Sequence, residues 1–334
     1  MAYQIDAEGT VDLGGIRLPV PATVSQEARA YLASPPWVDA PPTDEVRAMW
    51  ESRAFVDASL AELNRYARKL FPVSIEEIQI RGVRCHLVKP VESVAHDDGR
   101  QPVLINMHGG GFVMGSCSLV EAIPIAHLSG IPVISVDYRL APEHPYPAAV
   151  EDIVAVYREV LERHAPEDIG IYGSSAGGFL TGQTVMHLKR DGLPLPACLG
   201  IFTAGGDLSD LGDSARIFTL SGFWGQPILP SDHSLSEIRA YVGEAEITNP
   251  LLSPARGDLS GFPPTLLVTG TRDALLSGAA ALHRALLRVG ADADLVVFEA
   301  MPHSHWYNLR LPEAREALEI MVRHFRKHLC PERG

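Results

Sequence analysis

Two glycine-rich segments hold the residues best suited to chemistry. A serine, Ser175, stands in Gly-Ser-Ser-Ala-Gly at 173–177, directly after the apolar run 169–172. Glycines around a serine permit a sharp strand-to-helix turn that exposes its hydroxyl above a sheet. Upstream, His-Gly-Gly-Gly at 108–111 follows the apolar run 103–107. Its unhindered backbone N–H groups can point at a developing oxyanion, so the two segments together predict a serine hydrolase.

The other two groups that serine hydrolysis needs follow later apolar runs. A nucleophilic serine requires a base that takes its proton and an acid that orients the base. Asp273 follows the run 265–269, and His303 follows the run 295–299. Serine, acid and histidine thus occur in one of the chain orders that known triads use. We therefore predict that Ser175, Asp273 and His303 form a catalytic triad.

Two of these assignments have an alternative. Asp273 could instead cap the helix that begins near Leu275, since aspartate is a common N-cap residue. His303 competes with His305, which lies two residues further on. The residue types alone leave both alternatives open.

The glycine loop predicts where the oxyanion is held. We expect the N–H groups of Gly110 and Gly111, with that of Ala176 after the nucleophile, to form the oxyanion hole. Ala176 also begins a helix, whose N-terminus adds positive potential there. In the order serine, acid, histidine the base follows the nucleophile, whereas His108 precedes it, so we expect His108 to hold the loop by hydrogen bonds.

Ordered landmarks cover the chain from about residue 75 to its C-terminus. Besides the two glycine segments, they are YRLAPEHPYPAA at 138–149, GFPPTLLVTGTRD at 261–273 and Met-Pro-His at 301–303. Together they resemble the hormone-sensitive-lipase-like branch of the α/β-hydrolase fold. The first seventy or so residues match that branch only in general character.

The resemblance favours His303 over His305, because the family places its histidine directly after such a Met-Pro pair. It also implies a structural stretch under the site, in which we expect Arg139 and Glu143 to form a buried ion pair. One residue departs from the family pattern, since Ser174 stands where the branch usually has aspartate. The nucleophile itself is untouched by this change.

Apolar runs and amphipathic segments alternate from Ile75 onward. Period-two runs at 75–80 and 83–88 predict an antiparallel opening pair. The later alternation of strand and helix implies an α/β fold, a mainly parallel sheet with helices on both faces. The resemblance implies eight strands. The later strand-like runs are 103–107, 133–137, 169–172, 199–203, 265–269 and 295–299, and the helix-like segments are 118–129, 147–164, 176–190, 277–290 and 312–329.

Two segments outside this alternation predict a helical lid. Helices are expected near 25–33 and from Thr43 to about residue 70, each with one apolar face. Residues 207–254 follow the sixth strand and are too many for a structureless loop in a compact domain. We therefore divide the chain into an N-terminal helical lid, 1–73, and an α/β-hydrolase catalytic domain, 74–334, which carries the lid insertion.

Four side chains are candidates for the substrate pocket. Phe223 and Trp224 are large aromatics in a glycine-flanked part of the insertion, where they either line the acyl pocket or form the core of the lid. Phe112 follows the glycine loop, and His305 follows the catalytic histidine. A pocket narrowed by both lid segments favours short to medium acyl chains, as the resemblance also implies.

Composition narrows the classes of partner. The 334 residues carry a net charge of −13, which argues against a nucleic-acid or anionic-membrane surface. Neither metal-ligand spacing nor a nucleotide-binding glycine motif occurs, so we expect no metal and no cofactor. The four cysteines are predicted to be unpaired. No signal peptide or membrane-spanning run is visible, so we expect a cytoplasmic protein.

We predict a cofactor-independent serine carboxylesterase that hydrolyses short- to medium-chain carboxylic esters through an acyl-enzyme. A lactone hydrolase would use the same groups on a cyclic ester, and only the pocket shape separates the two. A ligand-binding receptor on this scaffold, as among the family's plant relatives, loses the histidine that this chain retains. The expected partner is a small-molecule ester or lactone, and the resemblance implies a homodimer as a common assembly.

Overall fold

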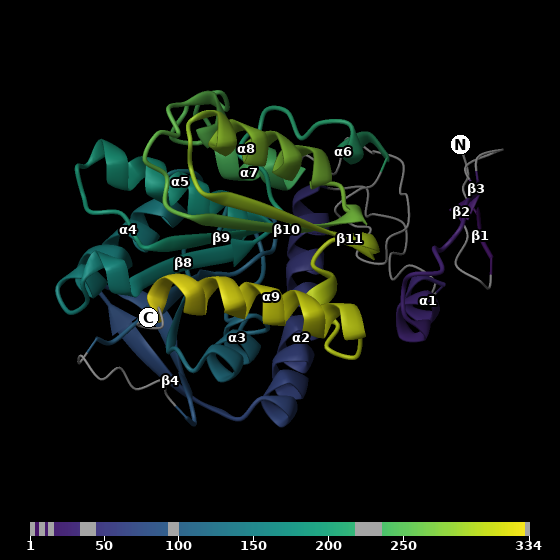
Figure 1. Ribbon diagram of the computed structural model, residues 1–334. Helices are drawn as coiled ribbons and strands as arrows, with labels where there is room; N and C mark the ends of the chain where they lie inside the picture. The colour runs from purple at the N-terminus through teal and green to yellow at the C-terminus, as the bar shows by residue number, and fades with distance from the viewer. Residues whose placement is uncertain are drawn as a thin grey trace.

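A twisted eight-stranded sheet forms the centre of the protein. The computed structural model describes residues 4–6, 11–12, 17–33, 45–92, 100–217 and 236–330. Within them the sheet has the strand order β11-β10-β9-β8-β6-β7-β5-β4 (Figure 1). β5 pairs antiparallel with β4 and with β7, whereas the other pairs in this sheet are parallel. The predicted eight-stranded, mainly parallel sheet is confirmed.

The expected elements are present with small shifts at their ends. The helices that were expected at 176–190 and 312–329 have those bounds in the structure. The strands of the large sheet are β4 (Val73–Ile80), β5 (Val83–Pro90), β6 (Val103–Met107), β7 (Val133–Val136), β8 (Ile169–Ser174), β9 (Cys198–Phe202), β10 (Thr265–Arg272) and β11 (Ala293–Pro302). The helices are α1 (Gln26–Leu32), α2 (Glu45–Leu70), α3 (Ala122–Ser129), α4 (Ala148–Leu161), α5 (Ala176–Arg190), α6 (Ser214–Ile217), α7 (Ser236–Val242), α8 (Leu276–Arg288) and α9 (Pro312–Leu329).

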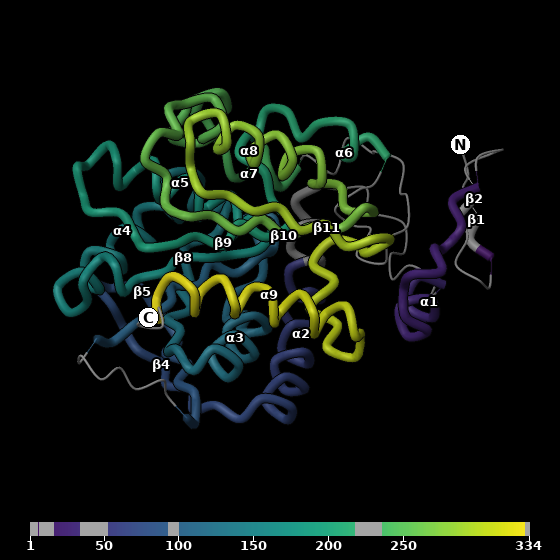
Figure 2. Tube along the Cα trace, in the orientation of Figure 1, coloured from purple at the N-terminus to yellow at the C-terminus, as the bar shows by residue number. Residues whose placement is uncertain are grey.

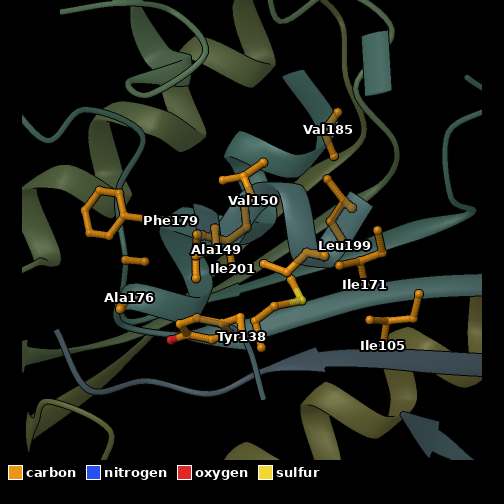
Figure 3. Close-up of a cluster of buried hydrophobic side chains, with 14 of the residues drawn as sticks. Ile105, Tyr138, Ala149, Val150, Ile171, Ala176, Phe179, Val185, Leu199 and Ile201 are labelled. Carbon is orange, nitrogen blue, oxygen red and sulfur yellow. The ribbon is translucent and has the colours of Figure 1, made fainter. Parts of the chain in front are cut away.

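Both faces of the sheet are buried under helices. On one face α4, α5 and α8 pack on strand residues such as Ile105 and Ile171, part of the cluster in Figure 3. On the other face α3 and α9 pack on Leu104 and Tyr172, and α9 crosses the sheet next to α3 (Figure 1). Because successive strand residues point to opposite faces, strands covered on both sides are apolar throughout. This is why the parallel strands read as continuous apolar runs.

The first of the two N-terminal helices, α1, has a side-chain cap. Ser25 Oγ accepts a hydrogen bond from the Ala28 N–H at 3.0 Å and so caps α1. The same hydroxyl donates to Glu313 on α9 over 2.8 Å, which fastens α1 to the body of the protein. Three two-residue strands precede α1 and form a small antiparallel sheet that the sequence did not predict: β1 (Gln4–Ile5), β2 (Val11–Asp12) and β3 (Arg17–Leu18).

The two predicted lid segments are partly described. α2 runs beside α3, as the chain traces in Figures 1 and 2 both show. The insertion after β9 contributes the short helices α6 and α7, and residues 218–235 between them lie outside the described part of the chain. α7 is joined to the stretch before α4, because the Tyr146 N–H donates to the Tyr241 carbonyl over 2.7 Å.

Candidate active site

Ser175 stands at a tight turn between β8 and α5. Its backbone has φ 56° and ψ −121°, a conformation that residues other than glycine rarely adopt. The turn also requires a close approach to β6, since a Cβ on Gly177 would lie 2.0 Å from the Met107 carbonyl oxygen. Glycine is therefore necessary at 177. The strained backbone presents a half-buried Ser175 at the carboxyl edge of the sheet.

Asp273 and His303 are hydrogen-bonded at the same edge of the sheet. His303 Nδ1 lies 2.9 Å from Asp273 Oδ1, and both side chains are buried. Each residue directly follows its strand, since β10 ends at Arg272 and β11 ends at Pro302. A carboxylate on Nδ1 holds the imidazole in the tautomer whose Nε2 can accept a serine proton.

Asp273 is surrounded by hydrogen-bond donors. Thr203 Oγ1 and Thr269 Oγ1 both donate to Oδ2, the latter over 2.7 Å, and the Leu275 N–H donates to Oδ1 over 2.9 Å. Burial by itself raises the pKa of Asp273, but the charge of His303 and the hydrogen bonds lower it further than burial raises it. The carboxylate is therefore ionised at neutral pH. The N-cap residue of α8 is Leu275, so helix capping does not explain Asp273.

The glycine loop after β6 lies against the serine turn. A Cβ on Gly109 would be 3.4 Å from Ser175 Cβ and 3.1 Å from the Ser174 carbonyl oxygen. Gly110 has φ 118°, and a Cβ there would lie 2.1 Å from the Met114 carbonyl oxygen. Only glycine fits this tight turn. Gly109 thus lies against the serine turn, and the predicted oxyanion residues Gly110 and Gly111 follow it directly in the chain, while Ala176 begins α5 after the turn.

His108 has the supporting role that its chain position predicts. Its Nδ1 lies 2.7 Å from the Gly109 carbonyl oxygen, and its ring stacks on Tyr138 with centroids 4.2 Å apart. The Tyr138 hydroxyl donates to the His108 carbonyl over 2.7 Å. Burial lowers the pKa of His108, so the imidazole is neutral. Tyr138, which follows β7, therefore holds the start of the glycine loop through His108.

Three polar side chains on one face of α2 hold the loop that follows the oxyanion glycines. Their contacts are with backbone groups of residues 113–119. These side chains make four hydrogen bonds, each written from donor to acceptor: Arg53 Nε to Val113 O (2.6 Å), Gly115 N to Asp57 Oδ1 (2.8 Å), Asn64 Nδ2 to Cys117 O (3.1 Å) and Leu119 N to Asn64 Oδ1 (3.0 Å). α2 was predicted as part of a lid, and it also fixes the loop from which the oxyanion hole is expected.

The predicted ion pair of Arg139 with Glu143 is wrong. Arg139 Nε donates to Asp152 of α4 over 2.9 Å, whereas Glu143 pairs with Arg53 of α2 at 2.7 Å. Neither side chain is buried, since Arg139 is 43% and Glu143 40% exposed. Tertiary packing brings Asp152 of α4 to Arg139 and Arg53 of α2 to Glu143, so each charge has a partner other than the one that is near in sequence.

The four pocket candidates have different surroundings. Phe112 is 3% exposed and stacks on Tyr241 of α7 with ring centroids 3.9 Å apart, so it joins the glycine loop to the insertion. His305 is 1% exposed and packs on Phe298 at 4.8 Å. Burial lowers the pKa of His305 to about 3. This interior position does not support a pocket role for His305. Phe223 and Trp224 lie outside the described residues.

Two buried residues at the site were missed by sequence reasoning. Thr203 follows β9, contacts Asp273, and lies 3.0 Å from His303 Nδ1 through its hydroxyl. Glu121 precedes α3 and hydrogen-bonds to Ser174, the residue before the nucleophile. No local motif marks either residue. Only the departure of Ser174 from the family pattern pointed to an unusual neighbour at this place.

The described ranges hold neither a metal-binding cluster nor a membrane-spanning helix. No cluster of three or more His, Cys, Asp or Glu side chains there could bind a metal ion. None of the helices that the structure describes is long and apolar enough to cross a membrane. All four cysteines are free thiols.

Comparisons with known proteins agree with this geometry. Residues 104–307 match a family described by the α/β-hydrolase fold. An acetyl-hydrolase from Streptomyces hygroscopicus is 36% identical over 231 residues, which are 68% of this chain and 75% of that protein.

Two crystal structures extend the similarity to the whole fold. An esterase that is 33% identical superimposes with a TM-score of 0.84 and covers 95% of this chain and 98% of its own. An esterase of the bacterial hormone-sensitive lipase family is 30% identical, with a TM-score of 0.74 and coverage of 90% and 95%. The chain belongs to the α/β-hydrolase family and is a serine esterase of the hormone-sensitive-lipase type.

Proposed function

We propose that this esterase hydrolyses carboxylic esters through an acyl-enzyme on Ser175, with His303 as the base and Asp273 as its orienting acid. The observation that carries the proposal is the buried Asp273–His303 hydrogen bond of 2.9 Å at the edge where the Ser175 turn is strained. An ionised carboxylate at Nδ1 stabilises the imidazolium that forms when His303 takes the serine proton.

The proposed reaction has two halves. Ser175 Oγ attacks the ester carbonyl while its proton passes to His303, and the oxyanion accepts hydrogen bonds from the N–H groups of Gly110, Gly111 and Ala176. The alcohol leaves with the proton from His303. Water then attacks the acyl-enzyme by the same route and regenerates Ser175. Loss of one hydrogen-bond donor from such an oxyanion hole typically lowers kcat by about 10²–10³-fold.

Short to medium acyl chains are the proposed substrates. The relative named acetyl-hydrolase supports a small acyl group. So does the position of α7, because a Cβ on Gly111 would lie only 3.2 Å from the Glu237 side chain. Residues 1–73 and about 207–254 are the proposed lid segments over this pocket. A lactone would meet the same groups as an open ester, so lactones belong in the substrate panel.

The test is a rate profile over p-nitrophenyl esters from acetate to palmitate, together with several lactones. We expect the highest kcat/KM between acetate and octanoate and no turnover by Ser175→Ala. Ser260→Ala, a change on an exposed turn, is the matched control and should behave as the wild type. Substantial hydrolysis by Ser175→Ala would refute the nucleophile, and an optimum at palmitate would refute the narrow pocket.

A further inference from the structure

A carboxylic acid is buried directly behind the serine turn. Glu121 is 2% exposed and occupies the N-cap position of α3, yet its side chain makes no capping hydrogen bond. The carboxylate is instead directed into the protein, where it contacts Ser174. An acid in this position loses its hydrogen bonds to water and makes none to the N–H groups of the helix N-terminus. Its contacts in the interior must compensate for that loss.

Three donors from three different segments meet at Glu121. Ser174 Oγ and Trp306 Nε1 donate to the same oxygen, the latter over 2.9 Å. Asn106 Nδ2 reaches the other oxygen at a longer 3.4 Å. The segments are the end of β8, the loop after β11 and the end of β6. Each of these segments carries, within four residues, a group of the proposed site: Ser175, His303 and Gly110.

Glu121 lacks a lysine or arginine partner among the residues that the structure describes. No lysine or arginine there forms an ion pair or a hydrogen bond with Glu121. Burial raises the pKa of Glu121, although its three hydrogen bonds and the charge of His303 lower it. Asp168, at the other end of β8, is a buried acid that does have a partner, because Arg100 bonds to it. The two acids therefore differ in what holds them.

We infer that Glu121 is a positioning residue that holds the Ser175 turn and the His303 loop in register, a role that rests on the function proposed above. Ser174 is adjacent to the nucleophile, and Trp306 follows His303 by three residues. One carboxylate oxygen that accepts from both side chains sets the distance between the two segments. Displacing catalytic groups by about 1 Å can cost roughly 10²-fold in rate.

The contact with Ser174 also explains the departure from the family pattern. The branch usually has aspartate at this position, and here a hydroxyl meets the carboxylate of Glu121 instead. On the proposed role, either residue would supply one carboxylate behind the turn. An aspartate at 174 would extend toward the place that the Glu121 oxygen occupies, where the Trp306 N–H could donate to it.

The first test removes the carboxylate. Glu121→Ala should lower kcat for p-nitrophenyl acetate at least tenfold with KM changed less than twofold, because the reacting groups move while the pocket remains. The rate of Ser175 labelling by a fluorophosphonate should fall by a similar factor. Glu121→Gln keeps the acceptor oxygen and should retain more kcat than Glu121→Ala, which guards against a general loss of folding.

The second test moves the carboxylate to position 174. Adding Ser174→Asp to Glu121→Ala should restore kcat to within about threefold of the wild type. Ser174→Asp alone should be less active than this double variant, since two carboxylates then share one buried place. A merely structural Glu121 would not show such a rescue.

The control is Asp168→Ala, which removes a buried acid that directly precedes β8 and is paired with Arg100. It should lower the Tm and leave kcat within twofold. The inference is overturned if Glu121→Ala lowers the Tm but not kcat, or if Ser174→Asp fails to rescue kcat in the folded double variant. Ser175→Ala separates the two claims, because its inactivity together with a fully active Glu121→Ala would refute only the positioning role.

Discussion

The proposed triad residues and the loop after the oxyanion glycines are held by different kinds of contact. Asp273 and His303 directly follow strands of the sheet and are buried, with hydroxyl and amide donors around the carboxylate. Residues 113–119, which follow the glycine loop, are held by side chains of α2 that lie more than fifty residues upstream, and Glu143, which pairs with Arg53, is 40% exposed. Strand ends in a packed sheet have little freedom, whereas a loop that depends on contacts with a separate helix can shift with that helix. We therefore expect changes at the triad to remove activity and changes in α2 to tune it.

The largest loss of kcat should come from replacing His303, and the neighbouring His305 is the comparison. His303→Ala should lower kcat by several orders of magnitude, because triad members act as a unit. His305→Ala should leave kcat within about tenfold and lower the Tm, since its ring packs on Phe298 in the interior. Steady-state kinetics and thermal melts distinguish them. The opposite ranking would mean that the catalytic loop is assigned two residues out of register.

The acid of the triad should come next. Asp273→Asn should lower kcat by about 10⁴, because an amide no longer holds the imidazole in the productive tautomer. Thr203→Val is the matched change at the same carboxylate and should cost tenfold or less, since Thr269 and Leu275 continue to donate. Equal losses of kcat in the two variants would contradict a role for the Asp273 charge beyond its hydrogen bonds.

Loss of an α2 contact should have a smaller effect. Arg53→Ala removes the donor to the Val113 carbonyl and the partner of Glu143, so we expect kcat to fall about tenfold through the oxyanion loop. Arg65→Ala on the same helix removes only an exposed pair with Glu62, worth about 0–1 kcal/mol, and should have wild-type kcat. Wild-type kcat in Arg53→Ala would show that α2 does not tune the site.

The smallest predicted effect is on stability against pH. In the folded protein burial lowers the pKa of His305 from 6.5 to about 3, so the unfolded chain binds the extra proton first as pH falls. The contribution of the neutral His305 to the free energy of unfolding is therefore fully present above pH 6.5. It falls by up to about 1.4 kcal/mol per pH unit between pH 6.5 and pH 3. His305→Phe should reduce the fall of Tm between pH 7 and pH 5. An unchanged slope would contradict a neutral, buried His305.

The sequence predicted those parts of the site that depend on local geometry and chain order. The Ser175 turn needs small residues at fixed spacing, and Asp273 and His303 follow apolar strands. Such patterns are visible over a few residues. The sheet and helices were likewise predicted with shifts of a few residues at their ends.

The missed contacts all depend on packing between distant segments. Arg53 meets Glu143 across ninety residues, and Glu121 meets Trp306 across 185. A single sequence carries no sign of such pairs. The ion pair predicted between Arg139 and Glu143 failed for the same reason, because proximity in sequence was taken for proximity in space.

The site of covalent labelling shows which residue is the nucleophile. The folded protein is treated with a fluorophosphonate, digested and analysed by mass spectrometry. We predict one adduct, on the Ser175 hydroxyl, formed slowly or not at all in His303→Ala. A stoichiometric adduct on another residue, or an active enzyme that forms none, would contradict the account.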